Sequence, residues 1–166
     1  MKPSLDEITI RTEPRAGDLG YVIYMHGDLY GREYGFGGQF ETYVAHGVAE
    51  FFENYDSSRD RIWLAEHEGR IIGSVVLMHR DDDTAQLRYF LIHPDYRGIG
   101  LGKRLMELWM DFAREVGYER AFLLTAGELD AAISLYRRHG FTLTSESYST
   151  AFGRPIQDQR YDAYLM

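Results

Sequence analysis

Apolar side chains recur every three to four residues in four segments of the chain, which is the spacing of one face of an α-helix. The segments cover 18–34, 40–55, 101–116 and 129–139. Gly117 follows the third segment, at the place where a glycine commonly ends a helix in the left-handed conformation. The pattern therefore predicts four helices, with a glycine-rich turn between the first two.

Short runs of branched and aromatic residues predict the strands. Glu68 and Gly69 separate two of these runs and predict a tight hairpin. The run RAFLLT is apolar after its first residue, so we expect it to be a strand buried on both faces. The acidic run DDD at 81–83 is interpreted as a solvated turn. The predicted strands cover 8–11, 63–67, 70–79, 86–93, 120–125, 141–150 and 158–166.

The order of these elements is one strand, two helices, three strands, a helix, a strand, a helix and two strands. This order predicts an α/β (α+β) fold in which a mixed sheet carries helices on both faces. With 166 residues and no repeat or low-complexity segment, the chain is expected to form a single domain over 1–166.

Composition narrows the classes of function. The net charge of −8 argues against nucleic-acid binding, which depends on Lys and Arg contacts to phosphates. The absence of cysteine excludes disulfides, thiolate metal sites and a cysteine nucleophile. No apolar run is long enough for a membrane span, and the first residues lack a signal-peptide core. We therefore expect a soluble, cytoplasmic protein without a metal or membrane partner.

A glycine-rich turn leads from the strand at 86–93 into the longest amphipathic helix. Gly98, Gly100 and Gly102 form this turn, and Arg97 and Lys103 flank it. The first N–H groups of a helix have no intrahelical partner and carry partial positive charge. No Ser, Thr, Asp or Asn stands directly before Gly98 to cap them. An anion can take the place of the cap, and phosphate is the anion that we expect.

The spacing of the glycines distinguishes this turn from other phosphate sites. A Walker A loop needs four residues between its glycines, whereas three separate Gly98 from Gly102. The dinucleotide-binding fingerprint needs a glycine where Lys103 stands. The remaining pattern, Arg97-x-x-Gly100-x-Gly102, resembles the pyrophosphate-binding signature of the GNAT superfamily of acetyl-CoA-dependent N-acetyltransferases. A tight turn that binds no ligand is the alternative interpretation of the same residues.

A second segment, AISLYRRHGF at 132–141, is similar to the A-x-x-L-Y-x-x-x-G-F motif of that superfamily. The resemblance assigns to Tyr136 the role of the acid that protonates the departing coenzyme A thiolate. The alternative is a core tyrosine, since Tyr136 lies three residues after Ile133 on the same face of the predicted helix. Many relatives carry Asn three positions before the motif, where this chain has Leu129, so a cofactor contact through that amide is in doubt.

The resemblance implies a largely antiparallel sheet of six to seven strands, acetyl-CoA as co-substrate, and direct transfer of the acetyl group to an amine in a ternary complex. Backbone groups of Leu91, Ile92 and His93 are expected to align the pantetheine and to polarise the thioester carbonyl. The residues expected to hold the pyrophosphate are Arg97, Gly98, Ile99, Gly100, Leu101, Gly102 and Lys103.

The general base and the acceptor are less well defined. Glu33 and Glu41 are the candidates for the base, and each is otherwise a surface carboxylate. His26 and His93 are weaker candidates. The acceptor is a small-molecule or peptide amine that the sequence does not identify, and a homodimer stays open. A catalytically silent acyl-CoA sensor and a ligand-free interaction domain are the competing functions.

Two segments also resemble one particular group within the superfamily. LRYFLIHPDYRGIGLGKRL at 87–105 and HGDLYGREYGF at 26–36 are similar to the acetyltransferase half of bacterial MarR–GNAT fusion proteins. A winged-helix half is absent from this sequence, so DNA binding is not implied.

Overall fold

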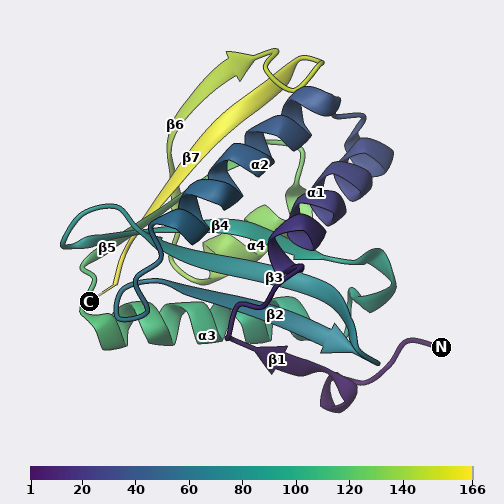
Figure 1. The fold of residues 1–166 in the computed structure, drawn as a ribbon. Coiled ribbons are helices and arrows are strands. Elements are labelled where there is room, and N and C mark those ends of the chain that lie inside the picture. Colours follow the sequence, from purple (N-terminus) through teal and green to yellow (C-terminus); the bar gives the residue numbers. More distant parts are fainter. Residues whose placement is uncertain (166) are drawn as a thin grey trace.

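The computed structural model describes residues 1–165, and their strands form one seven-stranded sheet (Figure 1). The sheet order is β1-β2-β3-β4-β5-β7-β6, and every neighbouring pair is antiparallel except β4 and β5. The predicted mixed, largely antiparallel sheet is therefore confirmed. The strands are β1 (Thr9–Arg11), β2 (Arg61–His67), β3 (Arg70–His79), β4 (Thr84–Ile92), β5 (Arg120–Ala126), β6 (Thr142–Ser149) and β7 (Ile156–Tyr164).

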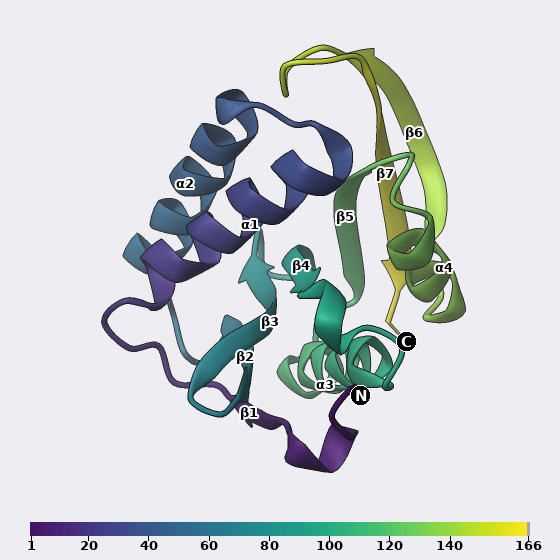
Figure 2. The same ribbon diagram turned by 90° about the vertical axis from the view of Figure 1, so that its right-hand side faces the viewer.

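The helices lie on both faces of the sheet, as predicted. Figure 2 shows the first two helices on one side and the other two on the opposite side. Within residues 1–165 none of the helices is both long and apolar enough to cross a bilayer. The helices are α1 (Asp18–Tyr34), α2 (Gly38–Glu53), α3 (Leu101–Val116) and α4 (Asp130–Arg138), with short 3-10 turns at Leu5–Glu7 (η1) and Pro94–Tyr96 (η2).

The local turn signals of the sequence are also confirmed. Glu68 and Gly69 join β2 to β3 with φ angles of 51° and 77°. Positive φ at both central residues gives the turn the twist that an antiparallel hairpin needs. Gly117 ends α3 with a φ of 99°, and its N–H donates to the carbonyls of Ala113 and Arg114.

The sheet separates two apolar cores. On the α3 side, Leu105, Trp109 and Leu123 are almost fully buried, and on the α1–α2 side Val76 and Phe51 are equally buried. The indole Nε1–H of Trp109 donates to the carbonyl of Val76 over 2.9 Å. This buried hydrogen bond joins α3 to strand β3.

One prediction about the sheet is wrong. The strand at 120–125 is not buried on both faces, since the side chain of Leu124 is 54% exposed. The α3 face of β5 is covered, as Ala121 and Leu123 show. The other face is open at Leu124 because β5 has already separated from β4 at this point and the side chain faces a cavity.

We expect Trp109→Phe to destabilise the protein by about 1–3 kcal/mol through the lost buried hydrogen bond, with a further loss from the unfilled volume. Trp63→Phe is the control, because Trp63 is also buried but makes no such hydrogen bond within residues 1–165. Urea unfolding of both variants measures the difference. Equal destabilisation of the two would show that the hydrogen bond contributes nothing beyond packing.

Candidate functional site

The sheet opens between β4 and β5. The two strands pair over four positions only, from Thr84 with Arg120 to Leu87 with Leu123. Beyond this point the second half of β4 and the end of β5 are not hydrogen-bonded to each other. Their backbone groups on that side are available to a ligand, since β-ladder groups that lack a neighbouring strand must find another partner.

A bulge in β4 lies at the start of this opening. The register with β3 shifts between Ser74 and Val76, and Tyr89 has a φ of 54°. The hydroxyl of Ser74 donates to the Tyr89 carbonyl over 2.7 Å and fixes the bulge. Arg88 is the Cα partner of Val76, which belongs to the α1–α2 core, and Tyr89 packs against the same core. The bulge thus places two successive side chains on one face of the sheet.

The glycine turn after β4 has the backbone that the sequence predicts. Gly98 and Gly100 have φ angles of 81° and 92°, and no side chain caps the first turn of α3 at Gly100. Gly102 has a second role. A Cβ there would lie 3.2 Å from Leu135 Cδ2 and 3.4 Å from Ile92 Cδ1, so the glycine lets α4 pack closely against α3. The uncapped amides and the missing Cβ atoms fit a pyrophosphate.

Arg97 lies at this turn, but its charge is engaged. The guanidinium binds the two carboxylate oxygens of Glu33 on α1 at 2.7 and 2.8 Å, and its Nε donates to the Ile92 carbonyl. The hydrogen bonds from Arg97 hold the pKa of Glu33 below its usual value. Arg97 therefore joins α1 to the turn, and Glu33 is a poorer proton acceptor than a free carboxylate.

Two lysines lie near the turn. Lys103 is largely exposed on the first turn of α3. The second is Lys2, which no sequence pattern predicts to lie here; its Nζ donates to the Arg97 carbonyl and would lie 3.8 Å from a Cβ on Gly98. No local signal in the sequence could place Lys2 here, because 95 positions separate it from Arg97.

Some backbone groups at the end of β4 already have hydrogen-bond partners within the protein. The N–H of His93 donates to the Ile72 carbonyl of β3 over 2.8 Å, so it is not free to contact a cofactor. The Ile92 carbonyl accepts from Arg97. Because backbone groups alternate in direction along an antiparallel ladder, Ile92 faces away from β3 and toward the opening. Of the residues expected to align the pantetheine, Ile92 is the best placed.

Tyr136 on α4 is 5% exposed and lies between Phe90 and Phe141, with ring centroids 5.9 and 6.2 Å away. Its hydroxyl makes no hydrogen bond among the described residues. Burial, with the nearby Tyr30, raises the pKa of Tyr136 well above its ordinary value. The hydroxyl is not enclosed by protein atoms, unlike that of Tyr89, so it is available to a ligand atom.

Tyr136 borders a cavity of about 580 Å³ on the α1–α2 face of the sheet. Aromatic side chains of α1 and α2 form one wall, and the ends of β4, β5 and β7 form the floor. The loop after β6 closes one end, where the Gly37 N–H donates to the Phe152 carbonyl over 2.9 Å (Figure 2). The residues that line the cavity include His26, Tyr30, Tyr43, Arg88, Tyr89, Leu124, Leu129, Tyr136, Phe152, Asp158 and Arg160.

The candidate bases do not line this cavity. Glu33 is bound to Arg97, and Glu41 lies against Gly27, where a Cβ would be 2.1 Å from its Oε1. His26 does line it: Nδ1 contacts the Val22 carbonyl at 2.8 Å, while Nε2 is buried without a hydrogen-bond partner. Burial lowers the pKa of His26 to about 4, so the ring is neutral at physiological pH.

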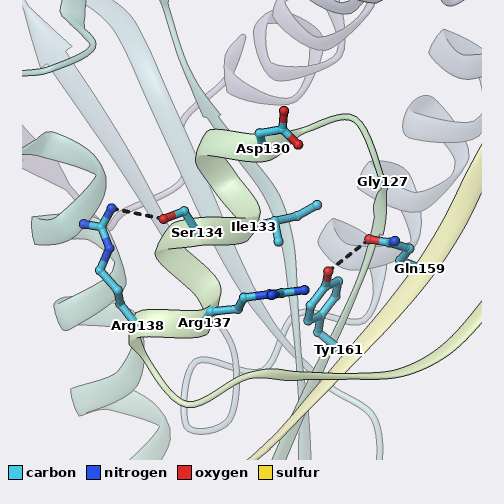
Figure 3. A pocket seen from close by; sticks show the side chains of 8 residues that line it. All are labelled: Gly127, Asp130, Ile133, Ser134, Arg137, Arg138, Gln159 and Tyr161. Carbon is cyan, nitrogen blue, oxygen red and sulfur yellow. Dashed lines mark hydrogen bonds between the residues drawn. The ribbon is translucent and has the colours of Figure 1, made fainter.

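A second hollow of about 600 Å³ lies between α4 and β7, on the other side of β7 (Figure 3). Arg137 extends toward Tyr161, with its guanidinium carbon 5.8 Å from the ring centroid, and Tyr161 donates to Gln159. This hollow contains neither Tyr136 nor a strand end from the opening. We therefore place the functional site at the first cavity.

The mixed sheet that opens between β4 and β5, with a glycine turn that leads into the uncapped start of α3, indicates the fold of an acyltransferase that uses acyl-coenzyme A. The sequence matches the Acetyltransferase (GNAT) family over residues 27–141, and the chain belongs to this family. YjgM of Escherichia coli, described as an uncharacterized N-acetyltransferase, is 34% identical over 95 residues, covering 55% of this chain and 57% of that protein. The chain spans between 44% and 57% of the length of such curated relatives.

Solved structures share the fold. A GNAT-family acetyltransferase from Staphylococcus aureus superposes with a TM-score of 0.78 at 19% identity, covering 96% of this chain and 99% of that one. A GNAT-family acetyltransferase from Elizabethkingia anophelis with acetyl-CoA bound superposes with a TM-score of 0.67 at 16% identity, over 96% and 99% of the two chains.

We expect Gly100→Asp to abolish acetyl-CoA binding, because it adds a carboxylate beside the uncapped amides of α3. The positive φ also costs a side chain about 1–2 kcal/mol of strain. Gly117→Asp is the matched control, since Gly117 has a φ of 99° and open space around it at the other end of α3. Calorimetric titration should show binding to the control and none to Gly100→Asp. Equal affinities would place the phosphate site elsewhere.

The Arg97–Glu33 pair yields a separate prediction. If Arg97 acts mainly by holding the turn against α1, Glu33→Ala and Arg97→Ala should weaken acetyl-CoA binding to similar extents, and the double variant should be no weaker than either. If the guanidinium instead contacts phosphate directly, Glu33→Ala should leave the affinity unchanged or raise it. Titrations at two salt concentrations separate these outcomes, because a direct phosphate contact weakens with salt.

Proposed function

We propose that this chain is an acetyl-CoA-dependent N-acetyltransferase that moves the acetyl group directly to an amine within a ternary complex. The observation that supports it best is Tyr136: the residue is 5% exposed and borders the cavity at the opening of the sheet, and its hydroxyl makes no hydrogen bond among the described residues. The family membership supplies the class of reaction.

In this reaction the acceptor nitrogen attacks the thioester carbonyl carbon, a C–N bond forms, and the C–S bond breaks. The role we give Tyr136 is to transfer its hydroxyl proton to the departing thiolate. A tyrosine with its ordinary pKa of about 10 is already protonated at neutral pH. Burial raises the pKa of Tyr136 further and makes the hydroxyl a weaker acid, so the proton moves only as negative charge develops on the sulfur beside it. The proton that the acceptor amine loses restores the tyrosine through solvent.

The residues that would hold the cofactor follow from the backbone. The amides between Gly98 and Gly102 would bind the pyrophosphate at the positive end of α3, and Arg97 would hold the turn in place. The opening beside Ile92 would receive the pantetheine. Leu129, where many relatives carry Asn, lines the cavity with an apolar side chain and so offers packing rather than a hydrogen bond.

Removal of the proton from the acceptor requires little from a carboxylate. An alkyl ammonium has a pKa of about 10.4 in water, and a low-polarity wall disfavours its charged form. Tyr30 and the other aromatic side chains supply such a wall. Glu33 and Glu41 would act as bases only through intervening water, since neither lines the cavity. Desolvation is therefore the main route that we propose for forming the neutral amine.

The expectations about cellular location, oligomeric state and the resemblance to fusion proteins stay proposals. A cytoplasmic location fits the composition, and the oligomeric state is open. The likeness of 87–105 and 26–36 to MarR–GNAT fusion proteins is a resemblance of sequence segments, and we propose no DNA-binding activity from it.

We expect Tyr136→Phe to lower kcat by about 100-fold, at the lower end of the range for a positioned acid, since a thiol of pKa about 8.5 is already a fair leaving group. The melting temperature and acetyl-CoA affinity should change little, because the hydroxyl has no partner to lose. Thiol release with an amine panel gives kcat, and a melting curve on the same preparation gives stability.

Tyr118→Phe is the control for this experiment. Tyr118 is 3% exposed and donates to the Arg59 carbonyl over 2.8 Å, outside the cavity. Its variant should lose stability and keep kcat, the reverse of the pattern for Tyr136→Phe. Unchanged turnover of Tyr136→Phe would make that residue a core tyrosine. Acetyl-CoA binding without thiol release by the native protein would favour the silent acyl-CoA sensor.

A further inference from the structure

We propose that the acceptor carries a carboxylate beside its amine, as a free α-amino acid does, and that Arg88 binds this carboxylate. This inference rests on the proposed acetyl transfer and names the class of acceptor for the same cavity. It is carried by the position of Arg88, by its lack of a carboxylate partner, and by the charges that share the cavity with it.

A bulge in β4 and a glycine of α2 together place Arg88 at the cavity. The bulge in β4 directs Arg88 and Tyr89 to the same face of the sheet, against α2. Gly47 of α2 makes room for both: a Cβ there would lie 2.8 Å from Nη2 of Arg88 and 2.0 Å from the hydroxyl of Tyr89. Any larger residue at Gly47 would push the guanidinium out of its place.

The charge of Arg88 is not neutralised within the protein. No carboxylate of residues 1–165 lies within 4.0 Å of its guanidinium, although the chain has 26 acidic residues. Its contacts are a 3.3 Å hydrogen bond from Nη2 to the Tyr43 hydroxyl and the faces of Tyr43 and Tyr89, 5.6 and 4.8 Å from its Cζ. Stacking on two rings orients the planar fork and leaves most of its N–H groups free.

The neighbouring arginines show the contrast. Arg160 also lines the cavity, but Asp162 accepts from its Nε and Nη2 at 2.9 Å each. Arg80 binds Glu50 just outside. Arg88 thus has guanidinium N–H groups in the cavity that no carboxylate occupies. A carboxylate is the planar group that two such N–H groups bind with parallel hydrogen bonds.

The other charge of the cavity fits the amine. Asp158 lines the β7 side of the same cavity and makes no ion pair within residues 1–165. A guanidinium on β4 and a carboxylate on β7 match a molecule with a carboxylate and an amine. A polyamine would bring a second positive charge toward Arg88, and that pairing is repulsive.

The test uses matched acceptors. L-leucine, L-phenylalanine and L-glutamine are each compared with their carboxamides and with the amines that lack the carboxyl group, at saturating acetyl-CoA, by thiol release. We expect kcat/KM for the amino acids to exceed that for both analogues by about 10- to 100-fold, the value of hydrogen bonds to a charged group. Equal or better turnover of the amines without a carboxyl group would overturn the proposal.

Variants locate the effect at one residue. Arg88→Gln should remove this preference, and Arg88→Lys should restore only part of it, since an ammonium lacks the planar pair of N–H donors. Arg120→Gln changes the net charge equally at an exposed site, bound to Asp83 at the closed end of β5, and should keep the preference. Loss of the preference in the control as well would overturn the assignment to Arg88.

A binding measurement distinguishes a failure of this inference from a failure of the proposed function. Calorimetric titration of the same amino acids and amines into the protein saturated with free coenzyme A, which carries no acetyl group to transfer, reports acceptor recognition without turnover. Binding of amino acids that Arg88→Gln abolishes, with no thiol release, would support the carboxylate site and refute the transferase. Absence of any such binding difference would refute the carboxylate site, whatever the turnover.

Discussion

The short pairing of β4 with β5 is the constraint on which the rest of the site depends. Parallel strands need a crossover between them, and here α3 supplies it while the two strands stay bonded over only four residue pairs. If the ladder continued, its hydrogen bonds would occupy the backbone edge beside Ile92, and Leu124 would be covered. Both the opening for a linear cofactor arm and the cavity on the α1–α2 face exist because this pairing stops.

The features around the opening act on different parts of the chemistry. The bulge at Tyr89 sets which side chains face the cavity on the α1–α2 face, whereas the glycines after β4 set the backbone of the turn where we propose that the pyrophosphate binds. The Arg97–Glu33 pair links the two, since it joins this glycine turn to α1, whose other residues form the cavity wall. A carboxylate that seemed suited to base catalysis from sequence is thereby used to hold the geometry, and its lowered pKa is the consequence.

Sequence periodicity predicted the elements well because each depends on its own residues: α1 begins and ends at the predicted positions, and the hairpin at Glu68 and the helix end at Gly117 follow from local backbone preferences. The cavity could not be predicted in the same way. Its charged residues come from β4 and from β7, which lies next to β5 only because the sheet order reverses at its end. The apolar run of β5 gave the wrong burial for Leu124 for the same reason, since composition does not tell where a neighbouring strand departs.

Specificity and amine activation would be coupled in such a cavity. In water the carboxylate of an α-amino acid stabilises the ammonium next to it, relative to the same acceptor with an amidated carboxyl group. When Arg88 binds that carboxylate, the guanidinium offsets its charge, and the aromatic wall adds the cost of desolvation. Both effects lower the pKa of the amine and act against Asp158, which stabilises the ammonium. An acceptor without a carboxylate would meet the unpaired guanidinium instead, which must then be desolvated without compensation. A single cation can in this way reject the wrong acceptor and help to form the neutral nucleophile of the right one.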